Sequence, residues 1–413
     1  MTAYFHIITL GCKVNRVEAD NIAAKLLAAG AERSDLQDAN LVFINTCTVT
    51  GEADSKSRKA QRRALREAPG AHIIVCGCGA VTNPDQFENN AERIHIISDT
   101  AEAISKAEDL LGLSQKEETQ LRMGESFNTR VAIKVQDGCD NRCSYCIVPF
   151  ARGPAKSVPM THILEEAKAY AEAGAQEMVL TGIDLGSYRH EGALLDTLLE
   201  ELLKVNATCR YRLSSIELPS ISDDLLQVIA KSDGRVCAHL HIPLQSGSDT
   251  ILASMKRRYD VAEFMDRIKT IKGVLPRVAL TTDVIVGYPG ETDEDFDETL
   301  AVCREVGFSR IHIFRYSKRE GTVAAELPGA VDATVMASRA QTLQVLSEEL
   351  THADAQSRMG SLEKVLFESD ERGRTESYYP VCALERSTRG NLVTMKLSSY
   401  QQGEFRAQEY TQQ

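Results

Sequence analysis

The chain has 413 residues, which suggests two or three domains, and its 43% hydrophobic content supports ordinary globular cores. No apolar run is long enough to span a membrane, and residues 1–10 lack the basic start and cleavage site of a secretion signal. We therefore expect a cytoplasmic protein whose eleven cysteines are reduced thiols and metal ligands, not disulfides. The net charge of −12 does not favour nucleic-acid binding, but a local basic patch can still bind phosphates.

The first section, residues 1–112, alternates strand-like and helix-like segments. Short apolar runs at 5–10, 41–44 and 72–75 are each followed by a loop and a helix-like stretch. This order is typical of an open parallel α/β sheet. Residues 113–128 are polar and aperiodic, so we expect them to form a linker.

The second section, residues 129–358, repeats the alternation more often. Six strand–helix units over about 220 residues predict a partial or full α/β barrel. A long helix pattern from 332 to 358 ends the section. The candidate strands lie at 130–136, 176–181, 210–214, 236–242, 278–285 and 310–315, with amphipathic stretches such as 161–173 and 292–305 between them.

The last section, residues 361–413, has short strand candidates at 365–368, 378–382 and 392–397. Gly373, Gly390 and Gly403 separate them or follow them. This pattern predicts a small antiparallel β-barrel. We therefore expect an α/β protein with an N-terminal open parallel sheet, a central barrel and a small C-terminal β-barrel.

Residues 139–146 read Cys-Asp-Asn-Arg-Cys-Ser-Tyr-Cys, a C-x3-C-x2-C motif. Closed iron–sulfur sites normally use four cysteines, and structural zinc sites use four cysteine or histidine ligands. Three cysteines without a local fourth ligand predict an open cluster; a zinc loop is the alternative. The spacing resembles the radical S-adenosylmethionine (SAM) signature, in which SAM binds the open iron. Tyr145 stands where that superfamily usually has an aromatic residue.

Three further cysteines, Cys12, Cys47 and Cys78, follow strand candidates of the first section. The carboxyl ends of strands in an open α/β sheet share one edge, so these three thiols could meet at a second metal site. They could equally be buried packing residues, and spacing alone does not choose between Cys78 and Cys76. We expect core packing for the four scattered cysteines, Cys209, Cys237, Cys303 and Cys382.

Segments throughout the chain resemble the methylthiotransferase family. They lie at 10–15, 45–50, 56–58, 136–139 and 316–322. They are most similar to the branch that modifies N6-threonylcarbamoyladenosine in tRNA. The isopentenyladenosine and ribosomal-protein branches usually differ at 13–14, 48–50 and 137. The resemblance implies a methylthiotransferase domain at 1–112, a radical SAM domain at 129–358 with a partial (β/α)6 barrel, and a TRAM-like domain at 361–413.

The resemblance also implies two [4Fe-4S] clusters, each held by three catalytically essential cysteines, with SAM as the cosubstrate. It selects Cys78 over Cys76, because the family's third auxiliary ligand lies in a Gly-Cys-x-Ala segment. The sequence departs from the family at Val81, which should affect packing, and at Asp184, near where SAM or the base would bind. The implied ligands are Cys139, Cys143 and Cys146 for the cluster that binds SAM, and Cys12, Cys47 and Cys78 for the auxiliary cluster.

Polar residues at the ends of the barrel strands are candidates for contact with SAM or the substrate, because α/β barrels build their sites there. His239 and His241 alternate along one strand, so we expect them to line the barrel interior; two histidines are too few for a metal site. The candidate contacts are Tyr145, Thr181, Gly182, Asp184, Glu217, Gln245, Ser246 and Asp283.

Residues 55–66 contain six basic residues and no acid. In a helix, residues four apart lie on one stripe, and a basic stripe could follow a phosphate backbone. The alternative is a solvated helix face. The stripe consists of Arg58, Arg62 and Arg66, with Lys59 and Arg63 beside it.

Two shorter basic segments, 256–258 and 318–319, are further candidates for RNA contact. Tyr378, Tyr379 and Phe405 could stack on bases, although strand core is the expected role for most of them.

The sequence therefore predicts an enzyme that inserts a methylthio group at C2 of N6-threonylcarbamoyladenosine in a tRNA anticodon loop. The alternatives are a methylthiotransferase for isopentenyladenosine or a ribosomal protein, and a non-catalytic RNA-binding metal protein. Besides tRNA, the expected partners are a sulfur source and an electron donor such as a flavodoxin or ferredoxin. We expect a monomer.

Overall fold

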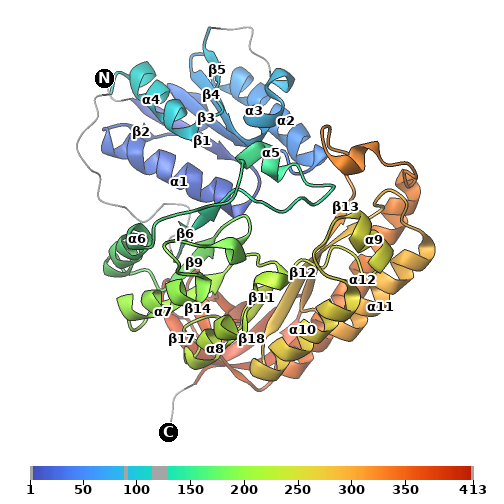
Figure 1. Ribbon diagram of the computed structural model, residues 1–413. Helices are drawn as coiled ribbons and strands as arrows, with labels where there is room; N and C mark the ends of the chain where they lie inside the picture. The colour runs from blue at the N-terminus through green and yellow to red at the C-terminus, as the bar shows by residue number, and fades with distance from the viewer. Residues whose placement is uncertain (1–2, 88–91, 114–128, 411–413) are drawn as a thin grey trace.

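The computed structural model describes residues 3–87, 92–113 and 129–410. Three parts are visible in Figure 1: an N-terminal sheet with its helices, an open barrel below it, and a small β-barrel against the far side of the open barrel. The linker expected at 113–128 lies outside the described residues, except for Leu113.

The N-terminal sheet is parallel, with the strand order β2-β1-β3-β4-β5. Its central strand β3 is buried along its whole length, as its apolar sequence requires. Helices α1 and α4 pack on one face, while α2 and α3 pack on the other. The elements are β1 (Tyr4–Thr9), α1 (Lys13–Ala28), β2 (Glu32–Arg33), β3 (Leu41–Thr46), α2 (Gly51–Glu67), β4 (His72–Gly77), α3 (Cys78–Thr82), β5 (Ile94–Ile96) and α4 (Thr100–Leu111).

The six expected barrel strands are all present, in two parallel sheets of order β10-β9-β6 and β11-β12-β13. Isolated parallel bridges, Tyr211 to Val236 and Ser215 to His241, join the two sheets. No described pairing joins β6 to β13, so the barrel is partial. Its strands are β6 (Arg130–Lys134), β9 (Glu177–Thr181), β10 (Arg210–Leu213), β11 (His239–His241), β12 (Ala279–Val286) and β13 (Arg310–Arg315).

Helices alternate with these strands and cover the outside of the barrel. Capping boxes fix the starts of two of them, at Asp260 before α10 and Thr292 before α11. A short antiparallel pair, β7 (Gln136–Asp137) and β8 (Lys156–Ser157), encloses the cysteine loop. The helices are α5 (Val148–Arg152), α6 (Met160–Glu172), α7 (Leu195–Val205), α8 (Asp223–Lys231), α9 (Asp249–Ser254), α10 (Val261–Val274), α11 (Asp293–Val306) and α12 (Ala333–Arg358).

The C-terminal strands form a closed barrel of order β14-β15-β16-β18-β17. Three of its strands were expected; β15 and β18 were missed. The barrel also departs from a purely antiparallel one, because β16 and β18 run parallel. Its core contains Val365, Tyr379 and Phe405. The strands are β14 (Leu362–Phe367), β15 (Arg372–Thr375), β16 (Pro380–Ala383), β17 (Leu392–Gln401) and β18 (Glu404–Glu409).

A buried charge cluster fastens the C-terminal barrel to the open barrel. Arg210 and Arg212 bind the fully buried Glu177 at 2.6 and 2.9 Å. Both arginines also donate to backbone carbonyls of the C-terminal barrel, at Lys364 and Glu376. Burial disfavours the charged form of Glu177, but the two arginines outweigh it and lower the pKa of this carboxyl.

Candidate active site

Cys12, Cys47 and Cys78 each follow a strand of the N-terminal sheet, after β1, β3 and β4, and all three line one cavity. Gly11 is required for this approach. Its φ is +97°, and a Cβ there would lie 2.5 Å from the Cβ of Cys47. The shared edge of a parallel sheet thus brings together three thiols from distant parts of the chain.

Cys76 and Cys78 have different environments, although one residue separates them. Cys76 is 1% exposed and packs in the apolar core between the sheet, α1 and α4. Cys78 begins α3 and lines the cavity. The remaining four single cysteines, Cys209, Cys237, Cys303 and Cys382, are buried, as core packing predicts.

Cys139, Cys143 and Cys146 lie on the loop between β7 and α5 and line the same cavity. Gly138 begins this loop with φ +68°, and a Cβ there would lie 2.1 Å from the carbonyl oxygen of Pro154. The backbone N–H of Asn141 donates to the sulfur of Cys139 at 3.4 Å. The loop therefore wraps back on its own first cysteine.

The two cysteine sets face one cavity of about 500 Å³. Within each set the thiols are close enough to act on one another. Burial, with a smaller contribution from the neighbouring cysteines, raises the pKa of Cys78 to about 11 and that of Cys146 to about 12. In the described ranges, no group of three histidine, cysteine or acidic side chains suits a single metal ion. A cubane cluster makes a different demand from a single ion, because each of its cysteine ligands binds a different iron.

Arg257 supplies positive charge beside the first cluster site. Its guanidinium is almost fully buried, donates to the sulfur of Cys143 at 3.3 Å, and forms an ion pair with Glu217. It also donates to the hydroxyl of Tyr145 at 3.5 Å. Arg257 belongs to the basic segment expected on the RNA surface; its burial in the site corrects that interpretation.

The structure divides the other expected SAM or substrate contacts into two groups. Thr181 and Ser246 do not line the cavity. The hydroxyl of Thr181 donates to the carbonyl of Val179, and the hydroxyl of Ser246 bonds that of Thr299. Those that line the cavity are Tyr145, Gly182, Asp184, Glu217, Gln245 and Asp283.

Two of these lining residues present polar atoms that no described residue bonds. They are Oδ1 of Asp184 and Oε1 of Gln245. Burial raises the pKa of Asp184, while Asn141 donates to its other oxygen at 3.1 Å. A buried unpaired acceptor is costly, so both atoms are suited to receive a ligand's hydrogen bonds. Val81, the other departure from the family, is 38% exposed, which corrects the expectation that it affects packing.

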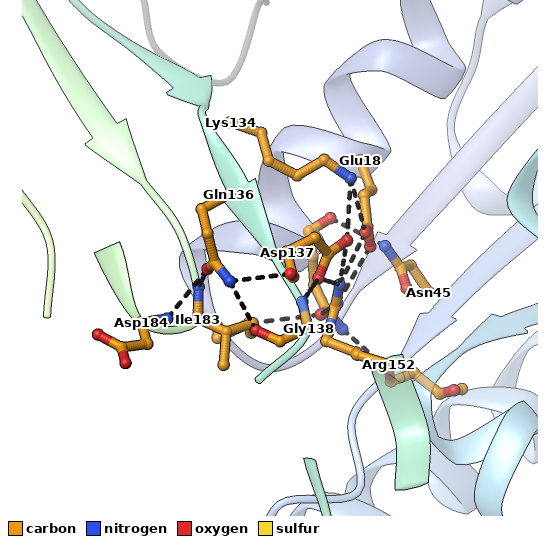
Figure 2. Close-up of polar contacts among 12 residues, drawn as sticks. Glu18, Asn45, Lys134, Gln136, Asp137, Gly138, Arg152, Ile183 and Asp184 are labelled. Carbon is orange, nitrogen blue, oxygen red and sulfur yellow. Dashed lines mark hydrogen bonds and ion pairs between the residues drawn. The ribbon is translucent and has the colours of Figure 1, made fainter. Parts of the chain in front are cut away.

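A polar network joins the loops that carry the two cysteine sets (Figure 2). Arg152, at the end of α5, donates to Glu18 and Asp137 at 2.9 Å and to Asn15 at 2.6 Å. Lys134 bridges Glu18 and Asp137 a second time. Asn15 and Glu18 belong to α1, whose first turn follows Cys12, so this network fixes one cysteine set relative to the other.

Gln136 connects the network to the barrel strands. Its amide nitrogen donates to the carbonyls of Asp137 and Gly138 at 2.8 Å. Its amide oxygen accepts from the backbone N–H groups of Ile183 and Asp184 (Figure 2). The loop after β9 and the cysteine loop are therefore held by one side chain.

Tyr378, considered from the sequence only as a possible base-stacking residue, reaches the cavity from the C-terminal barrel. Its φ of +75° is costly for a residue with a large side chain. Burial opposes ionisation of its hydroxyl, but Lys13, Arg130 and Arg374 outweigh this effect and lower its pKa. Of the three aromatic residues considered for stacking, Tyr379 and Phe405 lie in the barrel core as expected; Tyr378 does not.

Helix α2 carries the basic stripe and begins beside the loop after β13. Arg319 of that loop bonds Asp54 at 2.6 Å, so it is a contact within the molecule, contrary to the surface role expected for it. The backbone N–H of Gly51 donates to the hydroxyl of Ser317 at 2.9 Å. Lys59, Arg62, Arg63 and Arg66 are exposed, whereas Arg58 is half-buried and donates to Gln86.

Comparison with known proteins identifies the family. Residues 133–303 match the model of the radical SAM superfamily, and residues 4–99 match uncharacterized protein family UPF0004. A threonylcarbamoyladenosine tRNA methylthiotransferase MtaB from Bacillus subtilis is 40% identical, covering 84% of this chain and 81% of the relative. The chain belongs to the radical SAM methylthiotransferases.

Relatives of two substrate types resemble this methylthiotransferase. The MtaB protein of Thermotoga maritima is 35% identical, with 88% of this chain and 86% of the relative covered. A tRNA-2-methylthio-N(6)-dimethylallyladenosine synthase from Sulfurimonas denitrificans is 34% identical, with 97% and 94% covered. The radical SAM methyltransferase TsrM of Kitasatospora setae shares the fold, with a TM-score of 0.56, 14% identity, and 79% and 77% covered.

The cofactors of this methylthiotransferase are SAM and two [4Fe-4S] clusters. Each of the two cysteine sets that line the cavity offers three thiols, one fewer than a closed iron–sulfur site normally uses. Across the described ranges, none of the helices combines the length and the apolarity needed to cross a membrane.

Proposed function

We propose that this protein transfers a methylthio group to C2 of N6-threonylcarbamoyladenosine in a tRNA anticodon loop. One observation carries the proposal: two cysteine triplets, from loops far apart in the sequence, open into one cavity. A base bound in that cavity would be within reach of both clusters. The MtaB relatives, at 31–40% identity over most of the chain, support this substrate.

We assign Cys139, Cys143 and Cys146 to the cluster that binds SAM, and Cys12, Cys47 and Cys78 to the auxiliary cluster. When bound, the first cluster would supply the electron that cleaves one SAM to methionine and a 5′-deoxyadenosyl radical, and the second would supply the sulfur, whose methyl group would come from another SAM. Arg257 and Arg152 place positive charge beside the two thiolate sets, which stabilises ionised cysteines. Asp184, Glu217, Gln245 and Asp283 are the candidates to orient SAM and the base.

The nucleotide must leave the stack to enter the cavity, which suits an unstacked base of an anticodon loop. We propose that the exposed basic face of α2 follows the RNA backbone. We further propose three domains at 1–112, 129–358 and 361–413, joined by a linker at 113–128. The sulfur source, an electron donor such as flavodoxin or ferredoxin, a cytoplasmic location and a monomeric state complete the proposal.

The test is nucleoside mass spectrometry of tRNA from a host that makes threonylcarbamoyladenosine but not its methylthio form. We expect the methylthio nucleoside only when the gene is present, and not with the Cys143→Ala variant. Absence of this product, although the protein carries both clusters, would contradict the substrate assignment. Isopentenyladenosine tRNA and ribosomal-protein targets would then be assayed. Iron without SAM cleavage would favour a non-catalytic RNA-binding metal protein.

A further inference from the structure

Lys13, His239 and Tyr378 form the part of the cavity that we call the cavity floor. It lies where the barrel strands begin, since His239 is the first residue of β11. Lys13 enters from α1 of the N-terminal sheet, and Tyr378 enters from the C-terminal barrel. The floor is therefore built by all three parts of the molecule.

Cationic side chains gather around the floor. The Nζ of Lys13 lies 5.8 Å from the centre of the Tyr378 ring, and the guanidiniums of Arg212 and Arg374 lie 4.8 and 5.0 Å from it. The acids that pair with these arginines are already engaged: Glu177 binds Arg210 and Arg212, and Glu368 binds Arg130 and Arg374. Lys13 is open to the cavity and has no hydrogen bond or ion pair with any described residue.

His239 provides a second, independent sign of a ligand. Its side chain is 5% exposed, and its ring lies 5.2 Å from that of Tyr378. Nε2 lies 3.3 Å from the hydroxyl of Thr281, which satisfies one ring nitrogen. Nδ1 is buried without a hydrogen-bond partner among the described residues. A neutral imidazole that accepts at Nε2 donates at Nδ1, so this atom is free to donate to an acceptor in the cavity.

We propose that the cavity floor binds the carboxylate of the threonyl group on the substrate base. The proposal rests on the proposed function, and it explains how the site would distinguish this substrate from isopentenyladenosine. The threonyl group carries a negative charge, whereas an isopentenyl group carries no charge or hydrogen-bonding atom. Lys13 supplies the opposite charge and His239 a directed donor. A site built to bond a polar group rejects analogues that lack it, because its buried polar atoms stay unpaired.

The direct test compares the binding of two anticodon stem–loop RNAs to the cluster-loaded protein. One RNA carries N6-threonylcarbamoyladenosine, and the other carries its carboxamide, which is neutral and nearly the same shape. We expect the natural protein to bind the acid RNA about 10- to 100-fold more tightly, as a charge-assisted hydrogen bond implies. Lys13→Met should remove most of that ratio, and Lys13→Arg should keep most of it.

Lys25→Met is the matched control, because Lys25 is exposed at the other end of the same helix. It should leave the ratio unchanged. Iron content and melting temperature are measured for each variant, since Lys13 follows Cys12. If Lys13→Met loses iron, His239→Phe serves as the second variant. It removes the Nδ1 donor from β11, a strand that carries no cysteine of either cluster set, and it should also reduce the ratio.

Two results would overturn the proposal. One is equal binding of the acid and carboxamide RNAs by the natural protein. The other is equal weakening of both RNAs in Lys13→Met, because Lys13 would then contact an RNA phosphate. Product formation on the acid RNA is measured in parallel. If the protein discriminates between the two RNAs but forms no methylthio product, the proposed carboxylate site is supported and the proposed reaction is contradicted.

Discussion

Cys76 and Cys78 show how one residue's position decides between packing and chemistry. Successive side chains of a strand point to opposite faces, and Cys76, still within β4, points into the apolar core. Cys78 lies past the strand end, where the chain turns into α3 at the edge of the sheet. The environment, not the cysteine itself, makes only the second thiol available to a cluster.

Alanine substitution of single cysteines should distinguish the roles of the two clusters. Cys143→Ala should abolish SAM cleavage, because it removes a ligand of the cluster that binds SAM. Cys78→Ala should preserve SAM cleavage but block methylthio transfer, and Cys76→Ala should keep both. Iron content, 5′-deoxyadenosine and the modified nucleoside are the quantities to measure. Methylthio transfer by Cys78→Ala but not by Cys76→Ala would reverse the ligand assignment.

Glu166 on α6 offers a pH-dependent test of stability. Burial raises its pKa to about 7, against about 4.3 in an unfolded chain. The folded state therefore holds a proton that the unfolded state has lost, and stability falls as pH rises through this window. Glu166→Gln should gain melting temperature relative to the natural protein between pH 5 and pH 8, by roughly 2–5 °C. The exposed neighbour Glu165, changed to Gln, should show no such trend.

At the scale of elements, α2 has a fixed N-terminus and an exposed basic face. Its N-terminus is fixed to the loop after β13 by Arg319 and Ser317, next to the cavity. Its exposed residues include Lys59 and Arg63, and Arg63 pairs with Glu67 in a surface ion pair of little strength. This helix is therefore held rigidly while its basic face stays open to solvent.

Neutralising this face should weaken tRNA binding without changing the cavity. We expect Lys59→Gln combined with Arg63→Gln to lower the salt dependence of tRNA affinity by about two phosphate contacts. The matched control is Lys168→Gln with Lys204→Gln, since these lysines are exposed on α6 and α7. The measurement is the dissociation constant at several salt concentrations. An equal loss in the control pair would show a general charge effect and contradict a specific role of α2.

The sequence was sufficient to predict the strands whose own residues show a clear apolar pattern. β3, with its run of four apolar residues, and the six barrel strands lie within a few residues of their expected positions. β15 and β18 were missed because they are short and polar. Their place is determined by barrel closure, where Gly373 passes so near β14 that a Cβ would lie 2.4 Å from the carbonyl of Leu366. No pattern within a single strand carries that information.

At the scale of the whole molecule, Glu177 connects the open barrel to the C-terminal barrel. Glu177→Gln should leave Arg210 and Arg212 buried without their counter-ion and cost about 3–5 kcal/mol of unfolding free energy. Urea denaturation measures this loss. Glu201→Gln, which removes a surface pair with Lys204, should cost less than about 1 kcal/mol. Similar losses in both variants would mean that the buried cluster does not hold the two barrels together.

That the cysteines would meet at one cavity could be predicted, but much of its surroundings could not. The shared edge of a parallel sheet predicts a meeting of Cys12, Cys47 and one of the Cys76–Cys78 pair, and only the family resemblance chose Cys78. Arg257 and Arg319 were expected at the surface because their partners, Glu217 and Asp54, are distant in sequence. Tyr378 was considered only for base stacking, and its place in the cavity was not foreseen because a turn with positive φ in another barrel directs it there.

The contacts of Arg152 make the N-terminal sheet and the radical SAM part depend on each other. Arg152 belongs to the radical SAM part, yet its charge acts on Cys78 and its guanidinium bonds Asn15 and Glu18 of α1. The positive charge that acts on Cys78 of the N-terminal part therefore comes from a segment more than seventy residues further along the chain. The two parts cannot be exchanged independently: a chimera that replaces the N-terminal sheet with that of a relative must keep side chains at positions 15 and 18 that bond Arg152, or replace the segment that carries Arg152 as well.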